Sequence, residues 1–84
     1  MANARVSGVE PIFGEVLRRV RIKKQLSQEE LAFEAGVDRT FVSRLERGLK
    51  QPTITTLIGL GAALGVSAAD LVRETEKEYL RQQR

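Results

Sequence analysis

Residues 28–47 read QEELAFEAGVDRTFVSRLER, and they decide the fold because they encode two short helices joined by a tight turn. Ser27 and Glu30 have the spacing of a capping box, in which each side chain accepts the backbone N–H of the other residue. Gly36 can adopt the left-handed conformation that ends the first helix, and Asp38 is expected to cap the second. The pattern therefore predicts a helix, a glycine-centred turn and a second helix.

The second of these helices has two chemically different faces. At about 100° per residue, one arc of about 140° holds three arginines and two hydroxyl residues, Arg39, Thr40, Ser43, Arg44 and Arg47. The opposite side carries Phe41, Val42 and Leu45, which we expect in the core. Arginine can donate two hydrogen bonds to guanine, and Ser and Thr can pair with several base edges, so the polar face suits the DNA major groove. By charge alone, an ordinary solvated helix face remains the alternative.

The spacing of the whole stretch resembles the Xre/Cro-like helix-turn-helix family of small phage-type repressors and restriction–modification controller proteins. The residues that carry the resemblance are Gln28, Ala32, Gly36, Val42, Leu45 and Glu46, followed by Arg47-Gly48, Pro52-Thr53, Leu57 and Leu64 to Ser67. It covers about residues 12–72. It implies an all-α, five-helix, lambda-repressor-like bundle with an extended C-terminal helix. It also implies a structural ion pair between Arg21 and Glu46 that ties the first helix to the recognition helix.

Composition narrows the function class. At 84 residues the chain is expected to form one domain, too small to enclose a large substrate cavity. It has no Cys and no His, so it lacks a thiol nucleophile, an imidazole base and the ligands of a usual structural zinc site. We therefore expect a protein that is not an enzyme, with no catalytic residues, no metal and no cofactor. A carboxylate-only hydrolase is the enzyme alternative, and no Asp or Glu pair sits in a pocket-forming context.

Hydropathy and the distribution of charge indicate the expected location and the expected ligand. No apolar run approaches the roughly 18 residues of a membrane span, and no signal-peptide pattern opens the chain, so a cytoplasmic location is expected. Residues 1–50 carry ten basic and seven acidic side chains, whereas residues 51–84 carry four of each. The positive excess lies in the half with the recognition helix, as contact with DNA phosphates requires. Recognition of RNA is disfavoured because this surface has no array of aromatic side chains.

Along the chain, we predict a flexible tail over residues 1–8 and a DNA-binding domain over 9–84. Arg5 in the tail is a candidate for minor-groove contact. A first helix is expected to begin between Val9 and Ile12 and to bury Phe13, Val16, Leu17 and Val20. Thr53 should cap the helix after the loop, whose buried arc is predicted to hold Ile54, Leu57, Ile58, Leu60, Gly61 and Leu64. The C-terminal helix is expected over about residues 68–82.

These patterns give a definite set of predicted contacts. We predict that the residues that contact bases are Arg39, Thr40, Ser43 and Arg44. We predict that the residues that contact phosphates are Gln28, Arg47, Lys50, Arg18 and Lys23. One recognition helix reads only a few base pairs, whereas a two-fold dimer reads two half-sites about 34 Å apart, so we expect a homodimer on a palindromic operator. Its interface is assigned to the C-terminal helix, at Leu71, Val72, Tyr79 and Leu80.

Two points stay open in the sequence. The chain can instead be an antitoxin or co-regulator whose main role is to bind a partner protein, in which case the C-terminal helix and Phe33 form the binding surface. A C-terminal helix held only by local pairs such as Glu74 with Lys77 is the alternative to dimerisation. Phe33 and Phe41 fall partly outside the buried arcs of their helices, and we expect them to pack on each other across the turn, with contact to the DNA backbone as the alternative.

Overall fold

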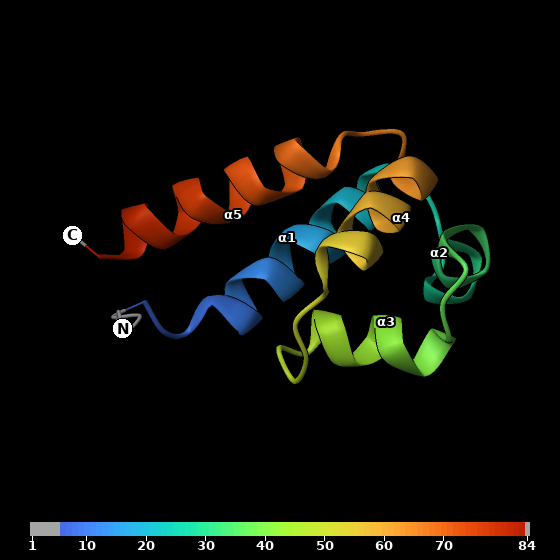
Figure 1. Cartoon of the computed structure of the whole chain (residues 1–84), viewed down its shortest axis with the longest axis horizontal. Coiled ribbons are helices and arrows are strands. Elements are labelled where there is room, and N and C mark those ends of the chain that lie inside the picture. The colour runs from blue at the N-terminus through green and yellow to red at the C-terminus, as the bar shows by residue number, and fades with distance from the viewer. Residues whose placement is uncertain (1–5, 84) are drawn as a thin grey trace.

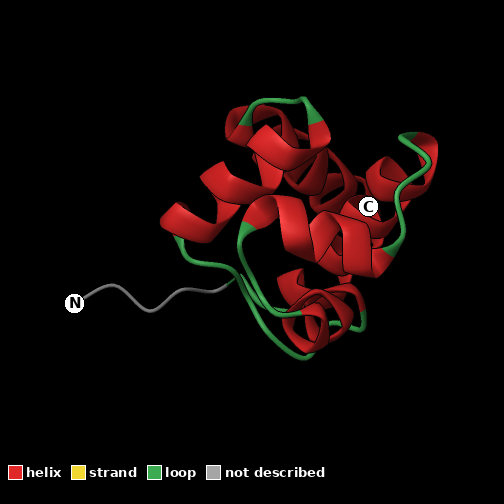
Figure 2. Ribbon diagram, turned by 90° about the vertical axis from the view of Figure 1, so that its right-hand side faces the viewer, coloured by secondary structure: helices red, strands yellow, loops and turns green. Residues whose placement is uncertain are grey.

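The computed structural model describes residues 6–83, which form five helices and no strand (Figures 1 and 2). Their bounds are α1 Val9–Lys23, α2 Gln28–Ala35, α3 Arg39–Glu46, α4 Ile54–Leu64 and α5 Ala68–Gln82. The predicted all-α, five-helix fold is confirmed. Arg5, the predicted minor-groove residue, lies outside the described residues.

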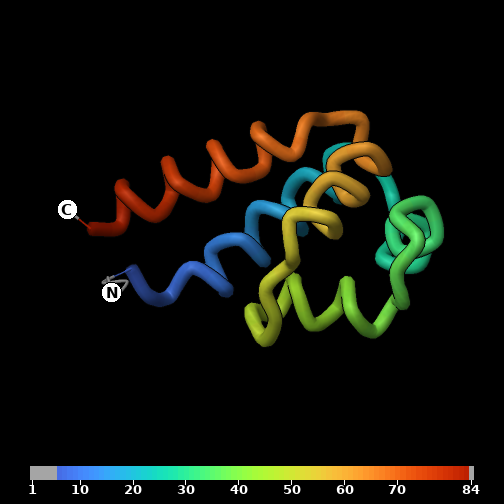
Figure 3. The backbone as a smooth tube through the Cα atoms, in the orientation of Figure 1, coloured from blue at the N-terminus to red at the C-terminus, as the bar shows by residue number. Residues whose placement is uncertain are grey.

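The helices surround one core. The long helices α1 and α5 pack along each other, α3 packs on α1 and α2, and α4 joins α2 to α5 (Figure 1). The end of α5 and the start of α1 lie at one end of the molecule, and α2 lies at the other (Figure 3). The recognition helix α3 forms one edge of the bundle and is held from its inner side.

Most helix ends follow the capping chemistry read from the sequence. The hydroxyl of Ser27 accepts the Glu30 N–H at 3.0 Å, and the Glu30 carboxylate accepts the Ser27 N–H at 2.8 Å, which completes the predicted capping box. Thr53 and Ser67 cap α4 and α5 in the same way, each accepting the N–H three residues on. Gln25, where the resembled family often has glycine, adopts φ 62°, so a non-glycine residue takes the left-handed conformation that ends α1.

One cluster of buried hydrophobic side chains draws on all five helices. Its members are Phe13, Val16 and Leu17 of α1, Leu31 and Ala32 of α2, Val42 and Leu45 of α3, Leu57, Leu60 and Leu64 of α4, and Leu71 of α5. Two predictions for α4 are wrong, because Ile54 and Ile58 are 71% and 59% exposed. The side of α4 that carries them is left uncovered by the other described residues.

The prediction that Phe33 packs on Phe41 is also wrong. Phe33 is 82% exposed, whereas Phe41 is partly buried and packs against the core. Their helices diverge at the Gly36 turn, so only the α3 ring is directed inward. Phe33 is therefore a large apolar side chain with no cover from the described part of the chain.

Two glycines of α4 allow close contact between backbones. A Cβ atom on Gly61 would lie 2.8 Å from the Val66 carbonyl oxygen, so this helix can turn directly into the loop that begins α5. A Cβ atom on Gly59 would lie 3.3 Å from the carbonyl oxygen of Ala35, at the crossing of α4 and α2. Each glycine weakens a helix interior by about 1 kcal/mol relative to alanine, but it allows a neighbouring backbone to approach the helix closely.

None of the five described helices has by itself the length and apolar composition of a membrane span. Only α4 and α5 taken together meet those two criteria, and they meet at a bend of 103°.

Candidate nucleic-acid interface

The two faces of α3 are separated as the sequence predicts. Val42 and Leu45 are fully buried on its inner side. Arg39, Thr40, Arg44 and Arg47 are exposed on its outer side, and Ser43 is partly exposed between them. Within residues 6–83, the side chains of Arg39, Thr40 and Arg44 make no hydrogen bond or ion pair, so their donors are free for a ligand. The Arg47 Nε donates weakly to the Ser43 carbonyl oxygen, at 3.4 Å.

The position of α3 is fixed by the carboxylate of Glu46 on its last turn. The Arg21 Nε donates to Oε2 of Glu46 at 2.6 Å, and the Arg21 Nη2 donates to Oε1 at 2.9 Å. The Arg21 Nη1 donates to the carbonyl oxygen of Leu26 at 2.9 Å. The hydrogen bonds that Arg21 donates to the Glu46 carboxylate raise the pKa of Arg21 above its ordinary value. The predicted ion pair is thus present, with side chains only 12% and 3% exposed.

Gln28 takes part in the same network, which sequence reasoning missed. Its Nε2 donates to Oε1 of Glu46 at 2.9 Å, so the carboxylate joins α1, α2 and α3. Spacing along the chain gives no signal for this bond, because Gln28 and Glu46 lie on different helices. A phosphate contact by Gln28 would have to use the second hydrogen of its side-chain amide or its backbone N–H in the first turn of α2.

The turn between α2 and α3 contains one further difference. Gly36 adopts φ 73° and ends α2 as predicted. Asp38 is the residue before α3, with extended backbone, but its side chain makes no capping hydrogen bond. The expected side-chain cap is therefore wrong, and Asp38 contributes only its backbone carbonyl oxygen, which accepts the Phe41 N–H at 3.0 Å.

Gly14 of α1 is a second residue that sequence reasoning missed. A Cβ atom there would lie 2.4 Å from the Leu45 carbonyl oxygen and 2.6 Å from that of Glu46. Only glycine lets the end of α3 lie this close to α1. Hydrophobic periodicity depends on which side chains are apolar, so it does not reveal a position where a residue without a side chain is required.

Some of the predicted phosphate-binding residues lie near α3 in the structure, and one does not. Arg47 and Lys50 are exposed at the end of α3 and in the loop that follows. Arg18 is exposed on α1, about 40° around that helix from Gly14 and hence beside α3. Lys23 is exposed about 180° from Gly14, so the structure does not bring it toward α3.

The predicted interface on α5 is also revised. Leu71 is 1% exposed and packs in the chain's own core, so it has no surface to bury against a second copy. Val72 and Leu80 are largely exposed and Tyr79 is partly exposed. With the exposed Ile54 and Ile58 they form what we call the α4–α5 apolar surface. Val72 lines both shallow grooves of this surface, one reaching the two isoleucines and the other reaching Tyr79 and Leu80.

These features define a helix-turn-helix protein, and comparison with known proteins agrees. The family model described as helix-turn-helix matches residues 17–71. The chain belongs to this family of DNA-binding transcriptional regulators, which are not enzymes, so the predicted family and protein class are confirmed.

Among its relatives, the HTH-type transcriptional regulator y4dJ of Sinorhizobium fredii is 41% identical over 66 residues, which is 79% of this chain and 86% of that protein. The control protein C.BamHI of Bacillus amyloliquefaciens is 36% identical over 67 residues, covering 79% of this chain and 83% of that one.

Solved structures show the same fold. The clp gene regulator ClgR of Corynebacterium glutamicum superposes with a TM-score of 0.84 at 31% identity, covering 92% of this chain and 82% of ClgR. The restriction–modification controller protein C.Esp1396I, solved as a tetramer on its natural 35-base-pair operator, gives a TM-score of 0.77 at 31% identity, covering 89% and 99% of the two chains.

Proposed function

We propose that this chain is a sequence-specific regulator of transcription that binds a palindromic operator in double-stranded DNA as a homodimer, in the cytoplasm of a bacterium. One observation carries the proposal. The outer face of α3 presents unpaired arginines and hydroxyl groups, while the inner side of the same helix is fixed by Glu46 and the core. A rigid helix with free donors is suited to reading base edges, because the donors need no rearrangement before binding.

Within this proposal, Arg39, Thr40, Ser43 and Arg44 contact bases. A good bidentate contact from an arginine to guanine discriminates against the wrong base by about 1–3 kcal/mol. Arg47 and Lys50 hold phosphates on one side of α3, Arg18 holds one near α1, and the first turn of α2 at Gln28 holds another. The operator of C.Esp1396I supports this mode of binding for a relative with the same fold.

The homodimer rests on the α4–α5 apolar surface. Soluble monomers rarely expose contiguous large apolar patches, and a patch on two adjacent helices is typical of an interface. A two-fold dimer through this surface leaves both α3 helices exposed, because α3 lies at a different edge of the bundle (Figure 1). Two half-sites about 34 Å apart would then be read together, which predicts a palindromic operator.

Selection from a random pool of double-stranded DNA tests the proposal. The expected product is an inverted repeat, with its half-sites about one helical turn apart. Ile58→Asp should convert the dimer into a monomer in sedimentation experiments, because it buries a charge at the interface. Leu49→Asp is the matched control, since Leu49 is also an exposed apolar residue but lies outside the α4–α5 apolar surface.

The second candidate function, an antitoxin or co-regulator that mainly binds another protein, has Phe33 in its favour because that side chain is so exposed. A chain that remains monomeric and selects no DNA sequence would support this candidate and refute the proposed regulator.

A further inference from the structure

The α4–α5 apolar surface contains two charged side chains. They are Arg73 and Glu76, and all other residues that line its two grooves are uncharged. Glu76 lines both grooves. Val72 and Leu80 stand about 40° to either side of it around α5, so its carboxylate lies in the middle of the apolar side of the helix. A second copy that covers this surface takes the carboxylate out of water, which is costly unless the copy supplies a positive charge.

Glu76 makes no ion pair within residues 6–83. Three ion pairs inside α5 include every other charged side chain of the helix, and they join Arg73 to Asp70, Lys77 to Glu74 and Arg81 to Glu78. Lys77 and Arg81 stand about 100° and 140° from Glu76 around the helix, whereas Arg73 stands about 60° from it. Arg73 is therefore the cation of α5 that a second copy can bring to Glu76.

Arg73 can bind a second carboxylate without leaving Asp70. Its Nη1 donates to Oδ1 of Asp70, and its side chain is 60% exposed. A guanidinium carries five N–H donors in a planar fork, so most of the donors of Arg73 remain available to a carboxylate that approaches from outside the chain.

Four exposed residues of α5 form a stripe that two copies can match. Ala69, Arg73, Glu76 and Leu80, which we call the α5 stripe, are spaced by four, three and four residues and lie within an arc of about 60°. This spacing is typical of the contact between two packed helices. It is symmetric about the point between residues 74 and 75, so it is the same in both directions along the helix.

An antiparallel contact between two copies of α5 uses this symmetry. When the two-fold axis passes between residues 74 and 75, Arg73 of each copy faces Glu76 of the other. The small side chain of Ala69 then faces the large side chain of Leu80 at both ends of the contact. Parallel helices would instead place the two Glu76 carboxylates against each other, and like charges at close range are costly. Charge and side-chain size therefore favour a second copy in the antiparallel orientation.

We propose that Arg73 of each copy binds Glu76 of the other across an antiparallel contact between the α5 helices, and that these two crossed ion pairs make the chain select its own copy over related helix-turn-helix chains. The inference rests on the proposed function, because it assigns the choice of partner to the proposed dimer surface. Charged pairs at an interface mainly give specificity, since a like charge opposite either residue rejects the wrong partner.

Charge-reversed variants of the full chain test the inference. They are Arg73→Glu, Glu76→Arg and the double variant that carries both changes. Arg81→Glu is the control for Arg73→Glu, because each change breaks an exposed i, i+3 ion pair of α5. Arg81 stands about 110° around the helix from the middle of the α5 stripe.

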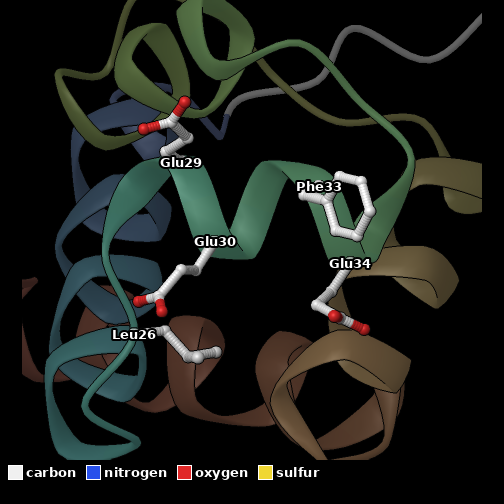
Figure 4. A pocket seen from close by; sticks show the side chains of 5 residues that line it. All are labelled: Leu26, Glu29, Glu30, Phe33 and Glu34. Atoms are coloured by element: carbon white, nitrogen blue, oxygen red, sulfur yellow. The ribbon is translucent and has the colours of Figure 1, made fainter.

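Glu34→Arg is the control for Glu76→Arg. Glu34 is an exposed glutamate on α2 and makes no ion pair among the described residues. It lines a shallow hollow together with Phe33 and Leu26 (Figure 4). No residue of this hollow lines either groove of the α4–α5 apolar surface. Because all the substituted side chains are exposed, the variants should unfold at nearly the same temperature as the parent chain.

The first measurement is sedimentation of each free protein over a wide concentration range. Arg73→Glu and Glu76→Arg each place like charges against each other at both crossed pairs, so their dimers should be weaker by about a hundredfold. Both controls should dimerise like the parent chain. The double variant exchanges the two charges and should also dimerise like the parent chain.

The second measurement mixes chains and identifies dimers by native mass spectrometry, with one chain isotopically labelled. The two single variants should form a heterodimer, because every crossed pair in it again joins opposite charges. The double variant should not pair with the parent chain, because both crossed pairs would then join like charges. Mixing changes the sequence of neither chain, so a local effect on α5 does not account for recovery in the heterodimer.

The outcomes separate the inference from the proposed function. Single variants that dimerise as strongly as a dimeric parent chain, or whose mixture stays monomeric, would overturn the crossed pairs and leave the homodimer intact. Free pairing of the double variant with the parent chain would overturn the selection of identical copies. A parent chain that stays monomeric would refute the proposed homodimer and the inference with it.

Discussion

Replacing Glu46 by alanine removes the acceptor that joins three helices. The carboxylate receives hydrogen bonds from Arg21 and Gln28, and its loss leaves the Arg21 guanidinium, whose side chain is only 12% exposed, without a counter-charge. Removing one partner of a buried ion pair costs about 3–5 kcal/mol. The whole domain is expected to have about 4–13 kcal/mol of stability at 84 residues, so a large share would be lost.

Urea unfolding followed by far-ultraviolet circular dichroism measures this loss. With a slope of about 2 kcal/mol per molar urea, the midpoint of Glu46→Ala should fall by about 2 M. Glu74→Ala is the control, because it breaks an exposed pair with Lys77 and should cost well under about 1 kcal/mol. The double variant Arg21→Met with Glu46→Leu should recover most of the loss, since no buried charge remains. A cost below about 1 kcal/mol for Glu46→Ala, or no recovery in the double variant, would refute this account.

Five other predictions use the described geometry. Gly14→Ala should lower the free energy of unfolding by about 1–3 kcal/mol, measured in urea, because its methyl group would overlap backbone carbonyls of α3. Ser27→Ala should cost about 1 kcal/mol in the same assay, because it removes the α2 cap. In DNA-binding assays across salt concentrations, Lys50→Ala should weaken binding to all sequences alike and reduce the slope of log affinity against log salt by about one unit. Arg39→Ala should instead relax the base preference at one position per half-site. Equal losses of affinity on operator and random DNA would exclude Arg39 as a base contact. Hydrogen bonds from Arg81 lower the pKa of Glu78. This carboxylate therefore stabilises the end of α5 fully above the ordinary glutamate pKa of about 4, and the stabilisation is lost as the pH falls through the lowered pKa. Far-ultraviolet circular dichroism should show α5 fraying in acid, and Glu78→Gln should abolish this pH-dependent change.

The elements of the fold could be predicted because their signals are local. Ser27, Thr53 and Ser67 each precede a helix and bond a backbone N–H three residues on, so a short sequence window contains the whole interaction. The same is true of the two faces of α3, which depend only on helical periodicity. The pair of Arg21 with Glu46 was supplied by resemblance to a family, since no local pattern links residues 25 positions apart.

The remaining features depend on how helices meet. Gly14 is needed because carbonyl oxygens of α3 approach it, and Gly59 eases a tight contact with the Ala35 carbonyl oxygen; neither neighbour is close in the sequence. Ile54 and Ile58 follow the helical period of a buried face, yet none of the five described helices covers them. Leu71 shows the converse, since a position assigned to an interface is filled by the chain's own core. Periodicity identifies a face as apolar but does not say whether it meets the same chain or another one.

The network around Glu46 separates the scaffold from the surface that we propose binds DNA. Among the described residues, the side-chain hydrogen bonds that tie α3 to α1 and α2 all end on Glu46 in its last turn, whereas the side chains of Arg39, Thr40 and Arg44 take no part in them. Exchanging those outer residues should therefore have little effect on folding. Such a chain can acquire a new target sequence through a few substitutions while its architecture persists, so diverging copies can come to control different genes.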